Sequence, residues 1–435
     1  MAAVRDVPGA ARVVTVPDVP RFSLVSLSLC AMIAGCDGVL PSAPPDDQVL
    51  DGPIDGLSGA QLARFAQGDQ EFNRVFSAEE GGGPIFVASS CGSCHVGDGK
   101  GHPVFNLTRF GRMVDGLFDP MRSQGGPQIQ NRAVQRYIAE VVPNGVTGAS
   151  VFTPPSVTGL GLLEAVDDTT LLGLADPDDA DGDGISGRVQ LLDEGDLIVE
   201  VTSLETVADE GGPTRGTPIG GKFIGRFGKK GVTVNLLHQT VTAYHQDMGL
   251  TTDLVLEDLF NRQVGNFASD DVPDPEVGSS TVSAVVFYLK TLRPPPRRDA
   301  GAPEVLAGEA LFAQVGCARC HLPALRTGAS PIGPLDRVEF NPYTDLLLHD
   351  MGPELDDGYT EGLALTSEWR TPPLWGIGLA ARSQGGRMHL LHDGRAGSLR
   401  EAIDFHGGEA AASRSGFNGL TTEEQERVLR FLESL

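Results

Sequence analysis

Residues 91–95 read CGSCH and residues 317–321 read CARCH, two copies of the pattern CxxCH in a chain of 435 residues. This pattern is the attachment signature of a c-type haem. The thiols add to the two vinyl groups of the haem, and the adjacent histidine becomes an axial ligand of the iron. A zinc site or a thioredoxin-like redox pair also uses CxxC, but a zinc site would not need histidine at the fifth position of both copies. The sequence therefore predicts two covalently bound haems c. The attaching residues are Cys91, Cys94, Cys317 and Cys320, and the proximal ligands are His95 and His321.

The sequence around the two motifs also repeats. A short amphipathic segment precedes each motif, with Phe72 in the first half and Phe312 in the second. Each half closes with apolar residues at helical spacing, over 281–292 and over 421–435. Thr421 and Glu424 have the spacing of a capping box at the start of the last helix. The fold class predicted is mainly α, with two cytochrome c-like haem domains.

The predicted domains cover residues 58–292 and 302–435. Residues 293–301 contain three consecutive prolines and are predicted to be a linker, because proline cannot continue a helix. The first domain is much longer than a minimal cytochrome domain. We therefore expect it to hold a large loop-rich insertion at about residues 100–280, in keeping with the 56 Gly and 30 Pro of the chain.

The N-terminal segment has the pattern of a bacterial export signal. The apolar run over 22–34 is too short to cross a membrane, and no second run approaches the roughly 20 residues that a span needs. Ile33-Ala34-Gly35-Cys36 is similar to a lipobox, whose cysteine is acylated and becomes the new N-terminus. We predict a signal over 1–36, a flexible tether over 37–57 and a lipoprotein facing the periplasm, held to the membrane by its lipid anchor only. A plain secretion signal and a soluble periplasmic protein are the alternative.

The composition excludes some classes of partner. The chain has 33 Lys+Arg against 58 Asp+Glu, for a formal net charge of −25. Because binding to phosphates needs Lys and Arg, this balance argues against nucleic acid as a partner. It suits a basic redox donor, such as a small cytochrome or cupredoxin.

Longer stretches make the chain resemble the bacterial di-haem oxidoreductases of the peroxidase type, relatives of the di-haem cytochrome c peroxidases. The resemblance covers about residues 58–435. The stretches that carry it are FVASSCGSCHVGDGKG (86–101), FTPPSVTGLGLLEA (152–165), LADPDDADGDGISGR (174–188), GRFG (225–228), QDMG (246–249), YTDLLLHDMG (343–352), WRTPPLWGIG (369–378), LHDGRA (391–396) and SLREAIDFHGGEA (398–410). Two positions depart from it. Lys229-Lys230-Gly231 stands where the family usually has Trp-Lys-Ala, and Leu391 stands where a methionine supplies a distal haem ligand in cytochrome c peroxidases.

The resemblance implies an oxidoreductase that passes electrons from a donor through one haem to a second haem, which reacts with peroxide or an oxidisable partner. Such an enzyme needs one iron with two strong axial ligands and one with an open position. A non-catalytic electron-transfer cytochrome of an envelope redox complex is the main alternative. A lipid-tethered sensor of iron or redox status is a third hypothesis.

The distal ligands remain open at the level of sequence. Candidates in the second half are Met388, Met351, His349 and His392. In the first half, His238 and His245 lie seven residues apart on a helix predicted over 232–248, hence on one face. Each could equally be a hydrogen-bonded histidine or a core methionine without a role at iron.

Three further features suggest roles near the haems. Glu164 lies in an apolar, Gly-rich stretch, where burial would raise its pKa and suit it to acid–base catalysis; the alternative is a paired structural carboxylate. Trp369 and Trp375 could relay electrons or pack against porphyrin. Asp179, Asp181 and Asp183 alternate as in a calcium loop, although Gln190 replaces the usual glutamate at the twelfth position. Calcium is therefore a predicted second cofactor, weighed against a solvated acidic loop.

Overall fold

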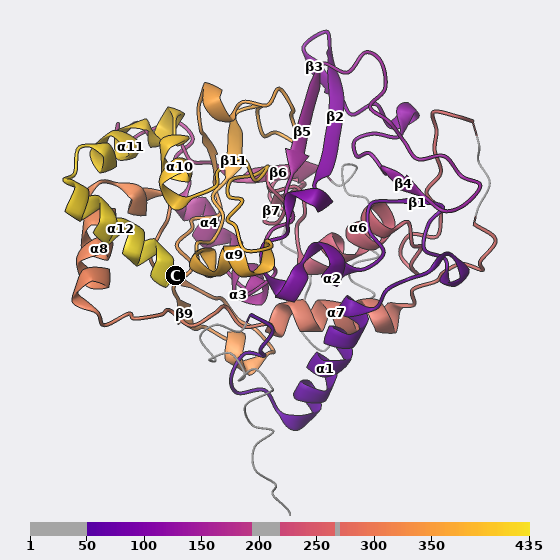
Figure 1. Cartoon of the computed structure of the whole chain (residues 1–435), viewed down its shortest axis with the longest axis horizontal. Coiled ribbons are helices and arrows are strands. Elements are labelled where there is room, and N and C mark those ends of the chain that lie inside the picture. The colour runs from indigo at the N-terminus through magenta and orange to yellow at the C-terminus, as the bar shows by residue number, and fades with distance from the viewer. Residues whose placement is uncertain (1–49, 194–217, 266–269) are drawn as a thin grey trace, which may run out of the picture. The chain divides into compact units, whose positions relative to one another are not determined.

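The computed structural model describes residues 50–193, 218–265 and 270–435, which fall in one compact unit (Figure 1). The signal, the lipobox Cys36 and most of the tether lie outside these residues. The helices are α1 (Gly59–Asn73), α2 (Cys91–Cys94), α3 (Leu160–Glu164), α4 (Asp168–Leu174), α6 (Leu236–Met248), α7 (Ser279–Thr291), α8 (Pro303–Gln314), α9 (Ala380–Ser383), α10 (Leu399–Asp404), α11 (Ala411–Asn418) and α12 (Thr422–Ser434). Among the described residues, no helix is long and apolar enough to cross a membrane.

The strands form small antiparallel sheets. A three-stranded sheet has the order β3 (Leu117–Asp119), β2 (Leu107–Val114), β5 (Gly148–Phe152). Four two-stranded sheets pair β1 (Ile85–Phe86) with β4 (Arg132–Ala133), β6 (Gln190–Asp193) with β7 (Lys222–Gly225), β8 (Leu325–Arg326) with β9 (Glu339–Phe340), and β10 (Leu348–Asp350) with β11 (Glu368–Arg370). The expectation of a mainly helical chain is thus confirmed only in part: helices surround the two motifs, and short strands organise much of the sequence between them.

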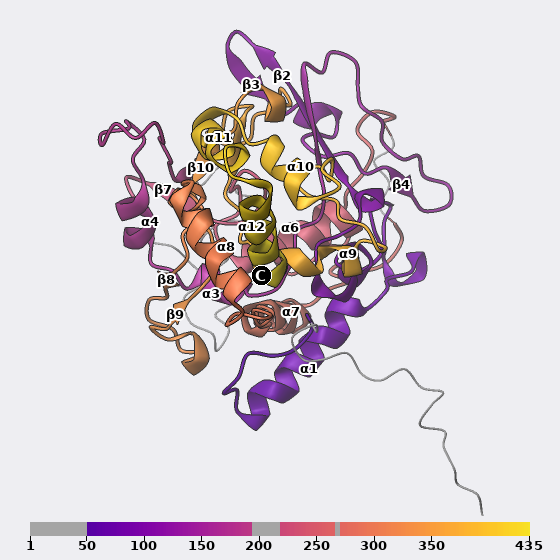
Figure 2. The ribbon, with the colours of Figure 1, turned by 60° about the vertical axis from the view of Figure 1, so that its left-hand side comes forward.

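Each half contains a pair of packed helices, α1 with α7 and α8 with α12. Figures 1 and 2 show α8 and α12 side by side in both views. A glycine lies at each crossing because the backbones approach closely. A Cβ on Gly68 would lie 2.2 Å from the carbonyl oxygen of Ala284, and a Cβ on Gly308 would lie 1.9 Å from that of Arg427. The sequence repeat is therefore a structural repeat at the helix crossings.

The predicted helices are confirmed with small shifts at their ends. The helix expected over 281–292 is α7, and the helix expected over 421–435 is α12. Its capping box is formed: the Thr421 hydroxyl accepts from the Glu424 amide at 3.3 Å, and the Glu424 carboxylate accepts from the Thr421 amide at 2.9 Å. The helix expected over 232–248 begins only at Leu236, because Asn235 caps it by accepting from the amide of His238 at 2.7 Å.

The proline-rich segment contains no helix or strand between residues 293 and 302, and α8 begins at Pro303. It is nevertheless anchored, since Arg297 donates to the Glu309 carboxylate at 2.8 Å.

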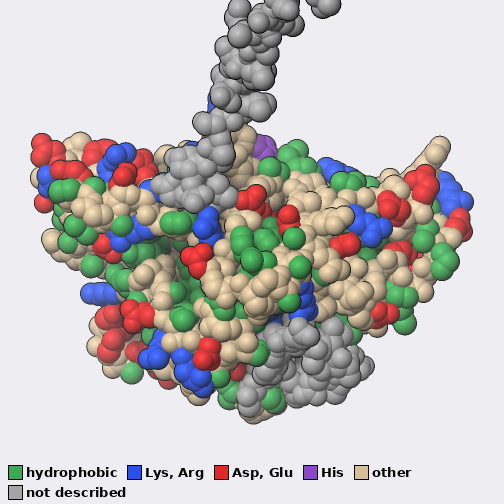
Figure 3. Space-filling model, turned by 90° about the horizontal axis from the view of Figure 1, so that it is seen from below, with side chains coloured by type: hydrophobic (Ala, Val, Ile, Leu, Met, Phe, Trp, Pro, Cys, Tyr) green, Lys and Arg blue, Asp and Glu red, His purple; other side chains and the backbone are tan. Residues whose placement is uncertain are grey.

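The buried apolar side chains form two main core clusters. One contains residues of α1, α6 and α7 with Leu325, Phe340 and Trp375, and the other contains residues of α8, α10, α11 and α12. On the face seen from below in Figure 3, acidic and basic side chains are interspersed, with apolar side chains between them.

Candidate functional site

Both CxxCH motifs open into one internal cavity of about 1100 Å³. A pocket for a drug-sized ligand measures about 300–1,000 Å³, so this space suits something larger. Its lining includes all six residues of the motifs that sequence analysis selected, namely Cys91, Cys94, His95, Cys317, Cys320 and His321. The four cysteines form no disulfide. Burial raises the pKa of Cys91, Cys94 and Cys317 to about 12. These thiols lack the low pKa of a thioredoxin-like redox pair, which argues against that alternative.

The first motif forms the short helix α2, capped by Ser90, whose hydroxyl accepts from the amide of Ser93 at 3.1 Å. His95 follows this helix, with its Nδ1 2.7 Å from the carbonyl oxygen of Pro155. Because a carbonyl can only accept, Nδ1 carries the proton and Nε2 keeps its lone pair. Burial lowers the pKa of His95 to about 4, so the ring is neutral at pH 7. The ring of Phe72, from α1, lies 6.1 Å from that of His95.

The second motif repeats this arrangement. His321 places its Nδ1 2.9 Å from the carbonyl oxygen of Tyr343, and burial lowers its pKa to about 4. The ring of Phe312, from α8, lies 6.2 Å from that of His321. Each proximal histidine is therefore neutral, held through Nδ1 and ready to offer Nε2 to a metal.

Buried basic side chains also line the cavity. Lys100, Lys229, Arg109 and Arg370 are all part of its wall. Lys100 donates to the carbonyl oxygen of Leu391 at 2.9 Å, and burial lowers its pKa to about 7. Burial and the nearby Lys100 lower the pKa of Lys229 well below its usual range. Among the described residues, Arg109 is the one of these four that pairs with a carboxylate, that of Glu361 at 3.3 Å. A ligand that brings its own carboxylates, as a haem brings propionates, would complement this wall. The free thiols, the two neutral imidazoles and these basic side chains together fit a pair of haems.

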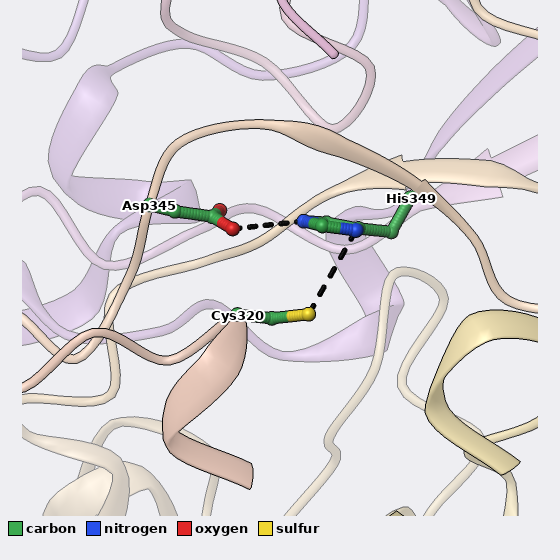
Figure 4. A group of neighbouring side chains, drawn as sticks. All are labelled: Cys320, Asp345 and His349. Atoms are coloured by element: carbon green, nitrogen blue, oxygen red, sulfur yellow. Dashed lines mark hydrogen bonds and ion pairs between the residues drawn. The ribbon is translucent and has the colours of Figure 1, made fainter. Parts of the chain in front are cut away.

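The contacts of His349 argue against this candidate as an iron ligand. Its Nε2 lies 2.8 Å from the Asp345 carboxylate and its Nδ1 lies 2.7 Å from the Glu409 carboxylate. Figure 4 shows the ring between Asp345 and the sulfur of Cys320. Burial alone would lower the pKa of His349, but Asp345, Cys320 and Glu409 raise it to about 12. A carboxylate at each nitrogen favours the doubly protonated ring, which would have no lone pair to offer to iron.

The other distal candidates differ in position. Met351 lines the cavity. His392 lines it too, but its ring stacks on Trp369 at 3.7 Å between centroids, with 11° between the planes. Met388 is not part of the described wall and packs against the core formed by α8, α10, α11 and α12. In the first half, His238 faces the cavity while His245 bonds the carbonyl oxygen of Glu257 at 3.0 Å, so the two do not serve one site.

Sequence reasoning missed His406. This residue lines the cavity, and its ring lies 6.5 Å from that of His321, with 46° between the planes. Its Nδ1 lies 2.7 Å from the carbonyl oxygen of Ala402, and burial lowers its pKa. The only sequence signal was the stretch DFHGGEA, which resembles the family but does not show which iron it faces.

Glu164 has the contacts of a structural carboxylate. It lies 3.2 Å from the ammonium of Lys290 and accepts from the amide of Leu236 at 2.7 Å, at the start of α6. It is not part of the described cavity wall. These contacts correct the expectation of an acid–base role and favour the paired alternative. Asp247 on α6 does line the cavity, and burial raises its pKa, although Gln128 donates to its carboxylate at 2.7 Å.

Both tryptophans line the cavity. Trp369 donates to the carbonyl oxygen of Leu355 at 2.8 Å, and the buried ammonium of Lys230 lies 3.8 Å from its ring centroid. Trp375 donates to the carbonyl oxygen of Thr158 at 3.2 Å. Their position is compatible with both sequence hypotheses, a relay and packing against porphyrin.

The acidic loop groups its carboxylates differently from the calcium pattern. Asp176, Asp179 and Asp181 bring oxygens within 4.8 Å of one another. Asp183 instead pairs with Arg319 at 3.3 Å. The loop also bonds its own backbone, for example from the amide of Gly184 to Asp179 at 3.1 Å. Calcium binding stays a prediction.

Comparison with known proteins identifies one family and several solved structures, two of which are described here. The model of the family described as "Di-haem oxidoreductase, putative peroxidase" matches residues 131–435, which is more than half of the chain and includes the second motif. Hydrazine synthase from Kuenenia stuttgartiensis is 15% identical with a TM-score of 0.37, over 98% of this chain and 100% of that one. A MauG-like protein associated with microbial copper homeostasis is 14% identical with a TM-score of 0.37, over 91% of this chain and 94% of that one. No curated protein matches the chain.

Proposed function

The chain belongs to the di-haem oxidoreductase family, and on this premise we propose that it is an exported c-type di-haem enzyme of the peroxidase type. It takes electrons from a small donor, passes them through one haem, and uses the other haem to reduce peroxide or to oxidise a partner. The observation that supports this proposal best is the single cavity that both CxxCH motifs line, each with a neutral histidine whose Nε2 is unprotonated.

The residues of the motifs would hold the two haems. In each motif the two thiols add S and H across the two vinyl groups, a reaction that needs no oxidant. His95 and His321 would offer Nε2 to the irons, and Lys100 and Lys229 would face the propionates. When bound, haem supplies redox-active iron that stores electrons and, where one axial position is open, binds peroxide.

We assign the acid–base role to Asp247, whose side chain lines the cavity. Peroxide reduction consumes two electrons and two protons and yields two waters, so a group at the wall must move protons. Burial raises the pKa of Asp247, which lets its carboxyl hold a proton closer to neutral pH than an exposed aspartate does. Glu164 instead forms an ion pair with Lys290 and accepts a hydrogen bond from the amide of Leu236 at the start of α6.

The remaining parts of the proposal concern location and partners. We propose that Cys36 anchors the protein by its lipid to a bacterial envelope membrane, facing the periplasm. The donor would be a small basic cytochrome or cupredoxin, which the net charge of −25 would attract. Trp369 or Trp375 would relay electrons, and the loop around Asp179 would bind calcium.

The test is peroxide turnover by the haem-loaded protein with a reduced cytochrome or an artificial donor. We expect turnover in the wild type and a loss of at least 100-fold in His95→Ala, because the first iron would lose its proximal ligand. His102→Ala is the matched control, since His102 is not part of the described cavity wall, and its turnover should stay unchanged. A fully loaded wild type without turnover and without reaction of either haem with peroxide would refute the proposal and favour an electron-transfer cytochrome.

A further inference from the structure

The ring neighbours of His95 and His321 are alike, with one exception. Phe72 packs beside His95 and Phe312 packs beside His321, at nearly equal ring distances of 6.1 and 6.2 Å. His321 has a further ring neighbour, His406, at 6.5 Å. Among the described residues, Phe72 is the only ring neighbour of His95; His238 of the first half lines the cavity but makes no ring contact with His95. His321 therefore has an imidazole beside it, and His95 does not.

The spacing of the two imidazoles matches a pair that shares one metal ion. Metal–nitrogen bonds to histidine measure about 2.0 Å. Two such bonds in line, with the ring radii added, place the centroids of opposed imidazoles about 6 Å apart. The rings of His321 and His406 are separated by 6.5 Å, and both residues line the cavity.

Both rings also have the correct nitrogen available. Nδ1 of His321 donates to the carbonyl oxygen of Tyr343, and Nδ1 of His406 donates to that of Ala402. Carbonyl oxygens cannot donate, so Nε2 of each ring keeps its lone pair. His349 is excluded because carboxylates hold both of its nitrogens.

The backbone around His406 is built to keep this ring in place. Gly408 has a φ of +50°, and a Cβ there would lie 2.1 Å from the carbonyl oxygen of Asp350. Glu409 then accepts from the amide of Asp350 at 3.1 Å and holds His349. The segment that follows His406 in the chain therefore packs against the end of β10. The hydrogen bond to the carbonyl oxygen of Ala402, on α10, holds the ring of His406 itself.

We propose that His406 is the distal ligand of the second haem iron, so that this haem would be six-coordinate with two imidazoles. The inference rests on the proposed function in that both motifs carry haem. It goes further, because it names the side chain of this chain that would fill the sixth position of the second iron.

The experiment is spectroscopy of the oxidised, haem-loaded full chain, by magnetic resonance and near-infrared magnetic circular dichroism. The wild type should show one low-spin haem with two imidazole ligands per two haems. His406→Ala should convert that haem to high spin, and added imidazole should restore the low-spin signal, a rescue that a merely structural role would not give. His406→Met should keep the haem low-spin, replace the signature of two imidazoles by that of His and Met, and raise its midpoint potential.

The controls are His392→Ala and Met351→Leu, which remove two other cavity-lining candidates of the second half and should leave the low-spin signal unchanged. The inference is overturned if the wild type shows no haem with two imidazoles, or if either control abolishes the signal. It is also overturned if His406→Ala, loaded with two haems, keeps the signal. These readouts need no peroxide turnover. A protein that has the signal and does not reduce peroxide would refute the enzyme and leave the ligand assignment standing.

Discussion

The helix crossing at Gly308 provides a direct test of the repeat on which the second haem site is built. We consider Gly308→Ala, which adds one methyl group where α8 meets α12. That methyl would lie 1.9 Å from the carbonyl oxygen of Arg427 and 2.9 Å from the Cβ of Phe431. Ordinary van der Waals contact begins near 3.4 Å, and the nearest obstacle is a backbone atom, so the helices must move apart by more than 1 Å.

The expected cost follows from two opposing terms. Overpacking of a well-packed contact costs about 1–3 kcal/mol, and a backbone obstacle places this case at the upper end. Alanine in place of glycine within a helix contributes about 1 kcal/mol in the opposite direction. The net destabilisation should therefore be about 2 kcal/mol. Gly68→Ala, with a backbone oxygen 2.2 Å from the added methyl, should behave in the same way.

The assay is urea unfolding of the haem-loaded protein, followed by far-ultraviolet circular dichroism and by haem absorbance. Gly173→Ala in α4 is the matched control, since nothing lies within 4 Å of its added methyl. It should stabilise the protein slightly, by up to about 1 kcal/mol. If Gly308→Ala unfolds at the same urea concentration as Gly173→Ala, the close crossing does not exist and the structural repeat is wrong.

Three further predictions concern buried charges. Asp247→Asn should lower peroxide turnover by about 100-fold or more, while Glu164→Gln should lower stability and leave turnover largely intact; equal effects of both variants on turnover would contradict the assignment. Burial raises the pKa of Glu140 from 4.5 to about 7, so the folded chain holds this proton after the unfolded chain has lost it. The contribution of Glu140 to the free energy of unfolding is therefore most favourable below pH 4.5 and declines by about 3 kcal/mol as the pH rises to 7. Thermal melts of Glu140→Gln at different pH values should lack this decline. Lys230→Met should destabilise by about 3–5 kcal/mol in urea, because three backbone carbonyls lose a buried ammonium; the exposed Lys222→Met should change stability by less than about 1 kcal/mol.

The features that could be predicted from the sequence are those encoded locally. A CxxCH pattern contains its own chemistry within five residues, and the capping box at Thr421 and Glu424 contains its own geometry within four. The apolar spacing of α7 and α12 likewise needs no knowledge of distant residues. The strands of the insertion were not predicted because they are short, and β2 pairs with a strand more than thirty residues away. Their stability depends on that pairing more than on their own composition.

The distal ligand could not be predicted for a different reason. His349, His392 and His406 look equivalent in sequence, since each stands in a stretch of the second half that resembles the family. The structure separates them by their partners. Carboxylates hold both nitrogens of His349, Trp369 covers the face of His392, and a backbone carbonyl leaves Nε2 of His406 available. Which of these partners a histidine meets is decided by tertiary contacts, so no local pattern could rank the three.

The difference that we propose between the two haem sites cannot come from the repeat itself. Within the repeat the sites are equal, with the same motif, the same Nδ1 bond to a carbonyl and nearly the same phenylalanine contact. What differs is the chain that each half adds after its motif: His406 in the second, and a wall with Asp247 and Lys229 in the first. If the proposal is correct, exchanging residues 92–93 for residues 318–319 leaves the two haems as they are. A change at His406 alone would open the second iron to peroxide, because in the proposal this one side chain fills the sixth position there.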